Sequence, residues 1–420
     1  MNGTFAGATS NLAFLAPSLT YDADNVYLTL TRNAIDFAAI GGTPNERAAG
    51  SGVQGLGFGN SIYNAVLMST APQARAAFDS LSGEIHATAH RAIVGDLDFV
   101  RDAILGRLRA TPSAGAAESP ALGYAAEKKV AKVAAPIFAR ALPLAPVYTT
   151  WGQAYGSYAH ADSDGNAAAM TADRAGVIAG VDVTLPADRR LGIVLGGSET
   201  RLTVPDRSSS ATIDNFHAAV YGAARWGAVG LRGGATATWN DLYTDRTIAF
   251  PGFSDDARAR YAGFAGQVFG EVGYRLDQAG VAREPFAGLA HIALRADPFT
   301  EVGGAAALTG LGRTEDVTFS TVGFRSAQEG LVGSMAVAAH ASLAWRHVIG
   351  GDTPSLALAF ASGSPAFLIA GVPIAVDTAV LEGGADMRVS PAATIGLAYQ
   401  GQLASGADEH SLKGLWRFRF

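Results

Sequence analysis

The feature that most limits what this chain can fold into is a strict alternation of apolar and polar residues from about residue 147 to the C-terminus. A period of two is the pattern of a β-strand with one face in an apolar environment. In the last segment Trp416, Phe418 and Phe420 share one face, while Lys413 and Arg417 share the other. An open sheet rarely exposes such an aromatic edge, because the edge would recruit other strands. The pattern therefore predicts a closed sheet whose aromatic face meets lipid.

The links between the alternating segments are short and long in turn. A short link is expected at Gly227, and long ones at Arg246–Ala259, Pro298–Glu315 and Val348–Val376. Outer-membrane barrels have short periplasmic turns and long external loops, and twelve crossings would return the C-terminus to the periplasm. We expect Trp151, Trp226 and Trp416 near the periplasmic ends, as part of an aromatic girdle. The expected strands are 147–161, 171–185, 190–204, 209–226, 228–245, 260–277, 281–297, 316–327, 334–347, 377–390, 393–405 and 410–420.

Composition agrees with this interpretation without deciding it. Hydrophobic residues make up 49% of the 420 residues, yet there is no uncharged apolar run of the ~18 residues that a membrane helix needs. A soluble all-β binding protein also alternates and stays an alternative. The absence of cysteine suits a chain that crosses an oxidising periplasm. The net charge of −6 argues against nucleic acid as a partner.

The N-terminal part divides into three zones. Residues 1–34 are strand-like, and residues 35–117 have helical spacing, with Leu97, Val100, Ile104 and Leu108 on one face. Residues 118–146 hold a further expected helix of ~22 residues, which would span ~33 Å. That length suits a membrane, but the segment is too polar to face lipid. Its polar residues include Lys128, Lys129 and Lys132.

Several segments together resemble a known family. The chain resembles the C-terminal translocator domain of autotransporters (type V secretion), and its upstream part resembles the end of a passenger β-helix followed by a helical segment. The barrel residues that carry the resemblance are Trp151–Gly156, Ser342–His347, Leu368–Pro373, Ile395–Gly401 and the terminal Phe418-Arg419-Phe420. The upstream residues are Phe14–Asp22, Val26–Thr31 and Phe78–His86.

The resemblance implies a 12-stranded antiparallel transmembrane β-barrel with a lumenal α-helix, anchored in the bacterial outer membrane and exporting its own N-terminal passenger. Twelve strands ~4.7 Å apart and tilted ~40° give a diameter of roughly 24 Å, which leaves room for about one helix. We expect the Lys-bearing helix 118–146 in that lumen, facing Glu271, Asp182 and Asn240. The family also implies that the ridge Trp416–Phe418–Phe420 is a signal for the barrel-assembly machinery. The barrel is expected to be monomeric in outer-membrane lipid.

The remaining motifs have plainer explanations. His86 and His90 stand four apart, as metal ligands can, but no third ligand is evident and we expect a surface or partly packed helix face. The glycine-rich Gly50–Gly55 lacks the flanking strand of a dinucleotide site and is expected to be a connector. No catalytic residues, cofactor or metal are therefore predicted, and the chain is not expected to be an enzyme.

Two further expectations concern cleavage and export of the passenger. No Asn lies between Asn64 and Asn166, so release of the passenger by attack of an Asn side chain in the linker is not expected. Residues Met1–Ala8 lack a basic and an apolar region, so the export signal is expected upstream. The alternatives to a translocator are a porin-like channel, or an adhesin whose passenger is mostly missing here.

Overall fold

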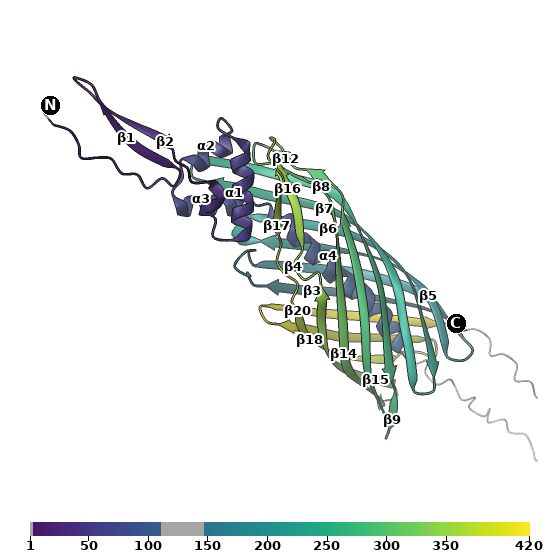
Figure 1. Ribbon diagram of the computed structural model, residues 1–420. Coiled ribbons are helices and arrows are strands. Elements are labelled where there is room, and N and C mark those ends of the chain that lie inside the picture. Colours follow the sequence, from purple (N-terminus) through teal and green to yellow (C-terminus); the bar gives the residue numbers. More distant parts are fainter. Residues whose placement is uncertain (1–2, 111–146, 334) are drawn as a thin grey trace, which may run out of the picture.

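Twelve long antiparallel strands close into a barrel in the computed structural model, which describes residues 3–110, 147–333 and 335–420 (Figure 1). Each strand pairs with its neighbours in the sequence, and the barrel closes where β20 pairs with β3. The predicted 12-stranded barrel is therefore confirmed. Its strands are β3 (Val147–Ala161), β4 (Met170–Leu185), β5 (Arg189–Val204), β6 (Ser209–Trp226), β7 (Val229–Phe250), β8 (Phe253–Tyr274), β10 (Val281–Ala296), β14 (Arg313–Val332), β15 (Met335–Gly350), β18 (Asp377–Arg388), β19 (Ala393–Ala404) and β20 (Ala407–Arg419).

The residues that alternate in the sequence face opposite sides of the barrel wall, with apolar residues on the outer surface and polar residues in the lumen. On β6, Phe216 and Val220 are 52% and 59% exposed on the outer surface, whereas His217 between them is fully buried in the lumen.

The barrel has a turn end, where the links are short, and a loop end, which carries the long links between β10 and β14 and between β15 and β18. The long link expected at Arg246–Ala259 is instead a two-residue turn, because β7 and β8 continue to Phe250 and Phe253. At the turn end Gly227 has a φ of 59°, a left-handed conformation that a glycine adopts without strain.

Two belts of outward aromatic residues mark the membrane. Phe216, Trp239 and Phe264 lie opposite one another on β6, β7 and β8, with ring centroids 5.8 and 5.7 Å apart. Further along β6, at its turn end, Trp226 is also exposed. Ten residues at ~3.3 Å each, tilted ~40°, separate the two levels by about 25 Å. This matches the height of the apolar band of outer-membrane barrels.

One expected girdle residue lies elsewhere. Trp151 is 3% exposed and points into the lumen, where its indole N–H donates to the Tyr221 hydroxyl at 2.7 Å. The predicted strand is confirmed, but Trp151 lies on its inner face. The residue type does not decide the face, because a tryptophan with a hydrogen-bond partner is also stable in the lumen.

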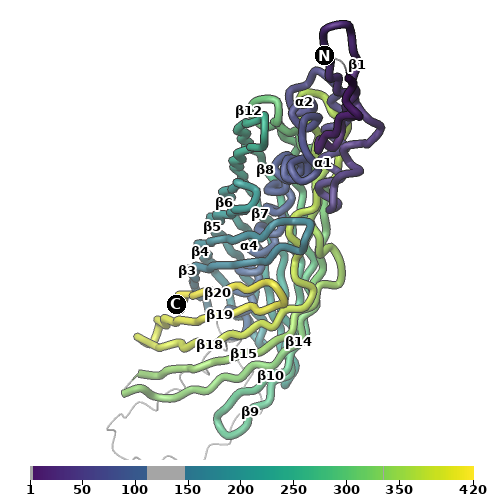
Figure 2. Tube along the Cα trace, turned by 90° about the vertical axis from the view of Figure 1, so that its left-hand side faces the viewer, coloured from purple at the N-terminus to yellow at the C-terminus, as the bar shows by residue number. Residues whose placement is uncertain are grey.

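The helix α4 (Glu84–Arg109) runs through the barrel from the loop end to the turn end. Its N-terminal residues contact the loops, and its C-terminal residues contact the turn-end halves of β4 and β8 (Figure 2). None of the helices in the described part of the chain combines the length and the apolar stretch needed to cross a lipid bilayer.

A small cap covers the loop end. It comprises the helices α1 (Pro44–Leu56), α2 (Ser61–Leu67) and α3 (Ala71–Leu81), the 3₁₀ turn η1 (Phe37–Ile40), and the hairpin of β1 (Leu15–Tyr21) and β2 (Val26–Arg32), which projects outward (Figure 1). α1 begins with a capping box in which the Thr43 hydroxyl accepts from Glu46 N–H.

Two long loops join the cap as a four-stranded sheet. This loop sheet is made of β11 (Phe299–Thr300), β13 (Leu308–Gly310), β16 (Ser355–Phe360) and β17 (Phe367–Ala370). Phe360 and Phe367 pack together at 5.4 Å, and Phe367 lies directly over Gly52 of α1. The short elements η2 (Pro205–Arg207), β9 (Leu276–Gln278) and β12 (Val302–Gly303) complete the described structure.

Candidate functional site in the barrel lumen

Ion pairs fix α4 at the turn end of the lumen. The Arg107 guanidinium donates to the Asp182 carboxylate of β4 from Nε at 2.6 Å and from Nη2 at 2.7 Å. Arg109 Nη2 donates to Glu271 of β8 at 2.5 Å, and Glu271 also accepts from Arg232 at 3.1 Å. Hydrogen bonds between an arginine and a carboxylate are stronger than those between neutral groups, and a bidentate pair also fixes the orientation of both side chains.

Polar side chains fix the middle of the helix in the same way. Asp96 is fully buried and accepts from Thr200 Oγ1 at 2.6 Å and from Asn215 Nδ2 at 3.1 Å. On the opposite side Asp98 binds Arg346 of β15. A helix whose acidic residues find polar partners on the wall suits a polar lumen and would not suit lipid.

Apolar packing supplies the rest of the contact. Phe99 is 1% exposed, and its ring stacks on Tyr155 of β3 with centroids 4.4 Å apart and planes at 5°. Leu97, Val100 and Ile104 are fully buried, as their common helical face predicted.

A second buried network joins α4 to the loop sheet. His86 Nε2 lies 2.8 Å from the Glu301 carboxylate, and its Nδ1 accepts from the Tyr261 hydroxyl at 3.1 Å. Glu301 is clamped from the other side by Arg246, with two hydrogen bonds of 2.8 Å. Burial alone would raise the pKa of Glu301, but Arg246 and His86 outweigh it and hold that pKa well below its usual range. Burial lowers the pKa of His86, so its imidazole is neutral.

The pKa of Glu84, the first residue of α4, is shifted in the opposite direction to that of Glu301. The Glu84 carboxylate accepts from the Ala168 N–H at 2.7 Å and from Arg207 Nε at 3.2 Å. Burial raises the pKa of Glu84 to about 7, even though Arg207 opposes the shift. Glu84 is thus a carboxyl at the loop end that changes charge near neutral pH.

The aromatic ridge of the last strand lies where the sequence placed it. Phe418 and Phe420 are 49% and 72% exposed on the outer surface, and Trp416 is half-buried over Gly152 of β3. The closing register sets Phe418 opposite Thr150. The ridge therefore belongs to the seam that closes the barrel, and its expected role in assembly stays a prediction.

The lumenal helix that the structure describes comes from a different segment than the one expected. Lys128, Lys129 and Lys132, with the rest of 118–146, lie outside the described residues. Asp182, Glu271 and Asn240 do point into the lumen, as expected, but Asp182 and Glu271 bind arginines of α4. The helix that the structure shows in the lumen is thus α4, from the region 35–117 that was expected to be only a connector.

The two histidines of α4 are buried and do not lie on a surface. His86 and His90 are 0% and 1% exposed, and each binds a carboxylate at the loop end: His86 binds Glu301, and His90 binds Glu315 of β14. Rather than forming a surface pair, they attach one face of α4 to the loop end. The sequence did carry one signal, since two histidines four residues apart share a helix face that needs polar partners.

This architecture matches one family of secreted proteins. The sequence profile described as the Autotransporter beta-domain matches residues 150–400, which is more than half of the chain. The chain belongs to the autotransporter β-domain family. As such it is an outer-membrane barrel that exports a passenger to the cell surface.

Relatives and a solved structure agree with the family. Two extracellular serine proteases of Serratia marcescens are 30% and 28% identical to this autotransporter chain over 462 aligned positions. The alignments include the whole chain but only 42% of each relative. The translocator domain of the autotransporter NalP from Neisseria meningitidis has the same fold, with a TM-score of 0.61, 14% identity, and coverage of 80% of this chain and 100% of that one. The matched domain is a transport barrel and not itself an enzyme.

Proposed function

We propose that this autotransporter barrel passes its passenger through the lumen in an extended form, and that α4 then stays behind as a plug. The observation that carries the proposal is the path of α4. The helix threads the lumen from the loop end to the turn end, paired to the wall along its length. The chain N-terminal to α4 therefore lies at the loop end, where a passenger that has crossed must be.

The size of the lumen supports the extended form. One helix of ~10–12 Å with its side chains occupies the interior. Two cavities beside it measure about 70 Å³ each, and a third, at the loop end beside His90, measures about 320 Å³. A folded domain is far wider than a single helix, so it cannot pass. The same fit disfavours a porin-like channel, which needs an open lumen.

A passenger whose folded state can be fixed by a disulfide bond tests this proposal. An exported passenger carrying one engineered disulfide across a long loop should fail to reach the surface when the disulfide has formed in the periplasm. Reductant added during synthesis should restore display, and the two single-cysteine passengers serve as matched controls. Equal surface levels of the oxidised and reduced passenger, measured by antibody on intact cells, would refute extended transport.

We also infer that the passenger is a serine protease. The support is the full-length alignment of this chain with the C-terminal part of the Serratia extracellular serine proteases. A fluorophosphonate probe applied to intact cells should label a surface protein joined to this barrel; no labelling of an exported, folded passenger would reject the inference.

Two further partners are proposed from the outer surface. The ridge Trp416–Phe418–Phe420 would be read by the barrel-assembly machinery, since it lies on the last strand, at the seam where closure is completed. Outer-membrane lipid would contact the band between the two aromatic belts.

No Asn occurs in α4. Self-cleavage by an Asn side chain therefore has no nucleophile in this helix, and we propose that the passenger stays attached until another protease acts.

A further inference from the structure

A glycine near the middle of α4 lies directly under an arginine of the barrel wall. Glycine is less favourable than alanine in the interior of a helix, and α4 contains two, Gly95 and Gly106. At Gly106 an added Cβ atom would meet no atom of the described residues within 4 Å. At Gly95 an added Cβ would lie 2.6 Å from Nη2 and 3.0 Å from Cζ of Arg174. The position of Arg174 therefore requires a glycine at residue 95.

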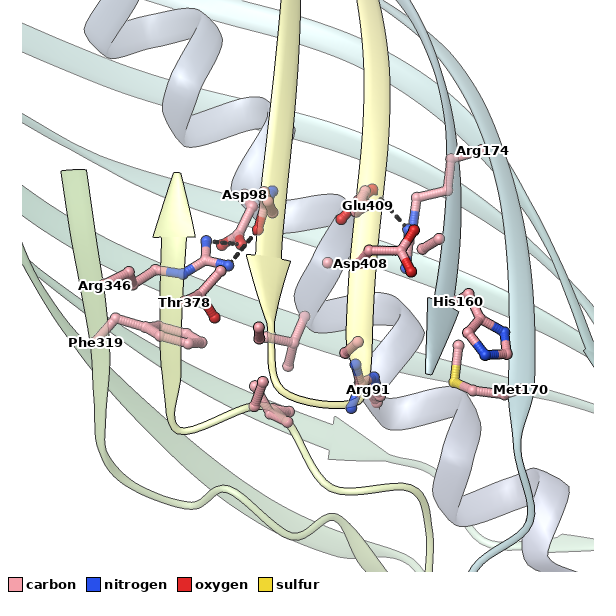
Figure 3. Close-up of a pocket in the computed structure, with 18 residues that line it drawn as sticks. Arg91, Asp98, His160, Met170, Arg174, Phe319, Arg346, Thr378, Asp408 and Glu409 are labelled. Carbon is pink, nitrogen blue, oxygen red and sulfur yellow. Dashed lines mark hydrogen bonds and ion pairs between the residues drawn. The ribbon is translucent and has the colours of Figure 1, made fainter. Parts of the chain in front are cut away.

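The Arg174 side chain of β4 reaches across the gap between the wall and α4. Its Nη1 donates to the Glu409 carboxylate of β20 at 2.9 Å (Figure 3), and its Nη2 donates to the Ala92 carbonyl oxygen of α4 at 3.5 Å. Its Nε lies 4.0 Å from the Asp96 carboxylate. The side chain is 3% exposed. The guanidinium is thus held by the wall on one side and by the helix on the other, over the Cα atom of Gly95.

The residues one turn away from Gly95 on the same face of α4 all carry a Cβ atom. Positions three and four residues apart lie above one another on a helix, about 5.4 Å along its axis. One turn toward the loop end are Arg91 and Ala92, and one turn toward the turn end are Asp98 and Phe99. If α4 slid by one turn in either direction, one of these side chains would overlap the guanidinium. Arg174 could give way only by leaving Glu409.

We propose that Arg174 is the positioning residue that sets where α4 stops in the lumen, and so where export of the passenger ends. The inference rests on the passage through the lumen proposed above. As the chain slides outward, Arg174 is displaced until Gly95 arrives, and the guanidinium then packs on Gly95 and pairs with Glu409. The ion pairs at both ends of α4 stabilise the same position, and the contact at Gly95 obstructs further sliding.

Pairs of engineered cysteines report the position of α4 in the chain exported with a passenger. The Val372 N–H lies 3.3 Å from the Thr88 hydroxyl, so Thr88→Cys with Val372→Cys should form a disulfide when α4 is in place. Ala92→Cys with Val372→Cys should form one when α4 has moved one turn further outward. The yield of this second disulfide should be severalfold higher in Arg174→Ala than in the parent. Arg174→Lys should restore part of the parent behaviour, because an ammonium can still pair with Glu409.

A suppressor pair tests the contact itself. Gly95→Leu fills the space in which the guanidinium lies, so it should lower the yield of the Thr88→Cys/Val372→Cys disulfide severalfold. Gly95→Leu combined with Arg174→Ala should restore that yield, because the leucine then occupies the vacated space. Gly106→Leu is the matched control: it makes the same change in the same helix, where the added side chain has room, and should leave the yield unchanged.

Surface display of the passenger, measured by antibody on intact cells, is recorded for every variant. Normal display with parent-like disulfide yields in both Arg174→Ala and Gly95→Leu would overturn the role of Arg174 and leave extended export standing. A loss in Gly95→Leu that Arg174→Ala does not restore would also overturn it, since Gly95 would then serve packing alone. Extended export fails by a different result, which is surface display of the oxidised passenger.

Discussion

Arg107 of α4 and Asp182 of β4 form a bidentate ion pair inside the barrel, at 2.6 and 2.7 Å, with 7% and 2% of their surfaces exposed. Arg190 lies 3.6 Å from the same carboxylate. The two partners are therefore unequal: Asp182 would keep a cation if Arg107 were lost, whereas both arginines depend on Asp182.

This asymmetry gives a first prediction. Asp182→Ala should lower the free energy of unfolding by about 3–5 kcal/mol, because it leaves two buried guanidinium groups without a carboxylate. Arg107→Ala should cost roughly half as much, since Arg190 still neutralises Asp182. Urea unfolding of the refolded barrel in detergent measures both. An equal loss of unfolding free energy in the two variants would show that Arg190 does not replace Arg107 as the partner of Asp182.

The stacked pair in the lumen gives a second prediction. Phe99→Ala should cost about 3–5 kcal/mol, the usual loss for emptying a buried phenylalanine site. Phe324→Ala, which truncates a ring that is 46% exposed on the outer wall, is the matched control and should cost much less in the same thermal or urea melt. A small loss for Phe99→Ala would mean that α4 contributes little to the stability of the barrel.

Glu84 gives a pH prediction. Its pKa of about 7 in the folded state lies above the ordinary 4.5, so the folded protein binds more protons than the unfolded one between these values. The contribution of Glu84 to stability is complete below pH 4.5 and is lost as the pH rises through 7. By linkage the loss is roughly 3 kcal/mol. Glu84→Gln, which cannot ionise, should remove this part of the pH dependence.

The comparison is made between the parent and Glu84→Gln from pH 4.5 to 8, so that His86 and the other titrating groups contribute to both proteins alike. The stability advantage of the parent over the variant should shrink as the pH rises. A difference that is constant with pH would contradict the raised pKa.

The C-terminal ridge gives a fourth prediction. Phe420 is 72% exposed, so deleting it should change the stability of the refolded barrel by little. If the ridge is read by the assembly machinery, the deletion should nevertheless lower the amount of folded barrel in the outer membrane severalfold. Phe324→Ala again serves as the control for loss of an exposed aromatic ring. Equal membrane levels with and without Phe420 would reject the signal.

The sequence was sufficient to predict the barrel because each strand separates two environments. Alternation such as Phe216–His217 is unambiguous when one face meets lipid and the other water, and the link lengths then give the topology. The ends of the long strands were not predicted, because β7 and β8 continue to Phe250 and Phe253, beyond the membrane. There the outer face becomes polar, as at Asp256 and Arg258, and apolar residues such as Ile248 and Ala257 face inward.

The lumenal helix could not be assigned from its pattern. A helix in a polar lumen needs apolar and charged residues on adjoining faces, as with Phe99 beside Asp98, and this looks like an ordinary amphipathic helix. The loop sheet was not predicted, for a different reason. Its strands are short, as in Phe299–Thr300 with Leu308–Gly310, and they join two loops that are distant in sequence.

The central claim is that α4 crosses the lumen with the cap outside and the short turns inside the cell envelope. The chain contains no cysteine, so single cysteines can report each side of an exported barrel. On intact cells a membrane-impermeant maleimide should label Ala23→Cys, in the β1–β2 turn, and should label Ala279→Cys, in the turn before β10, only after the outer membrane is permeabilised. Protection of Ala23→Cys together with labelling of Ala279→Cys on intact cells would contradict the account.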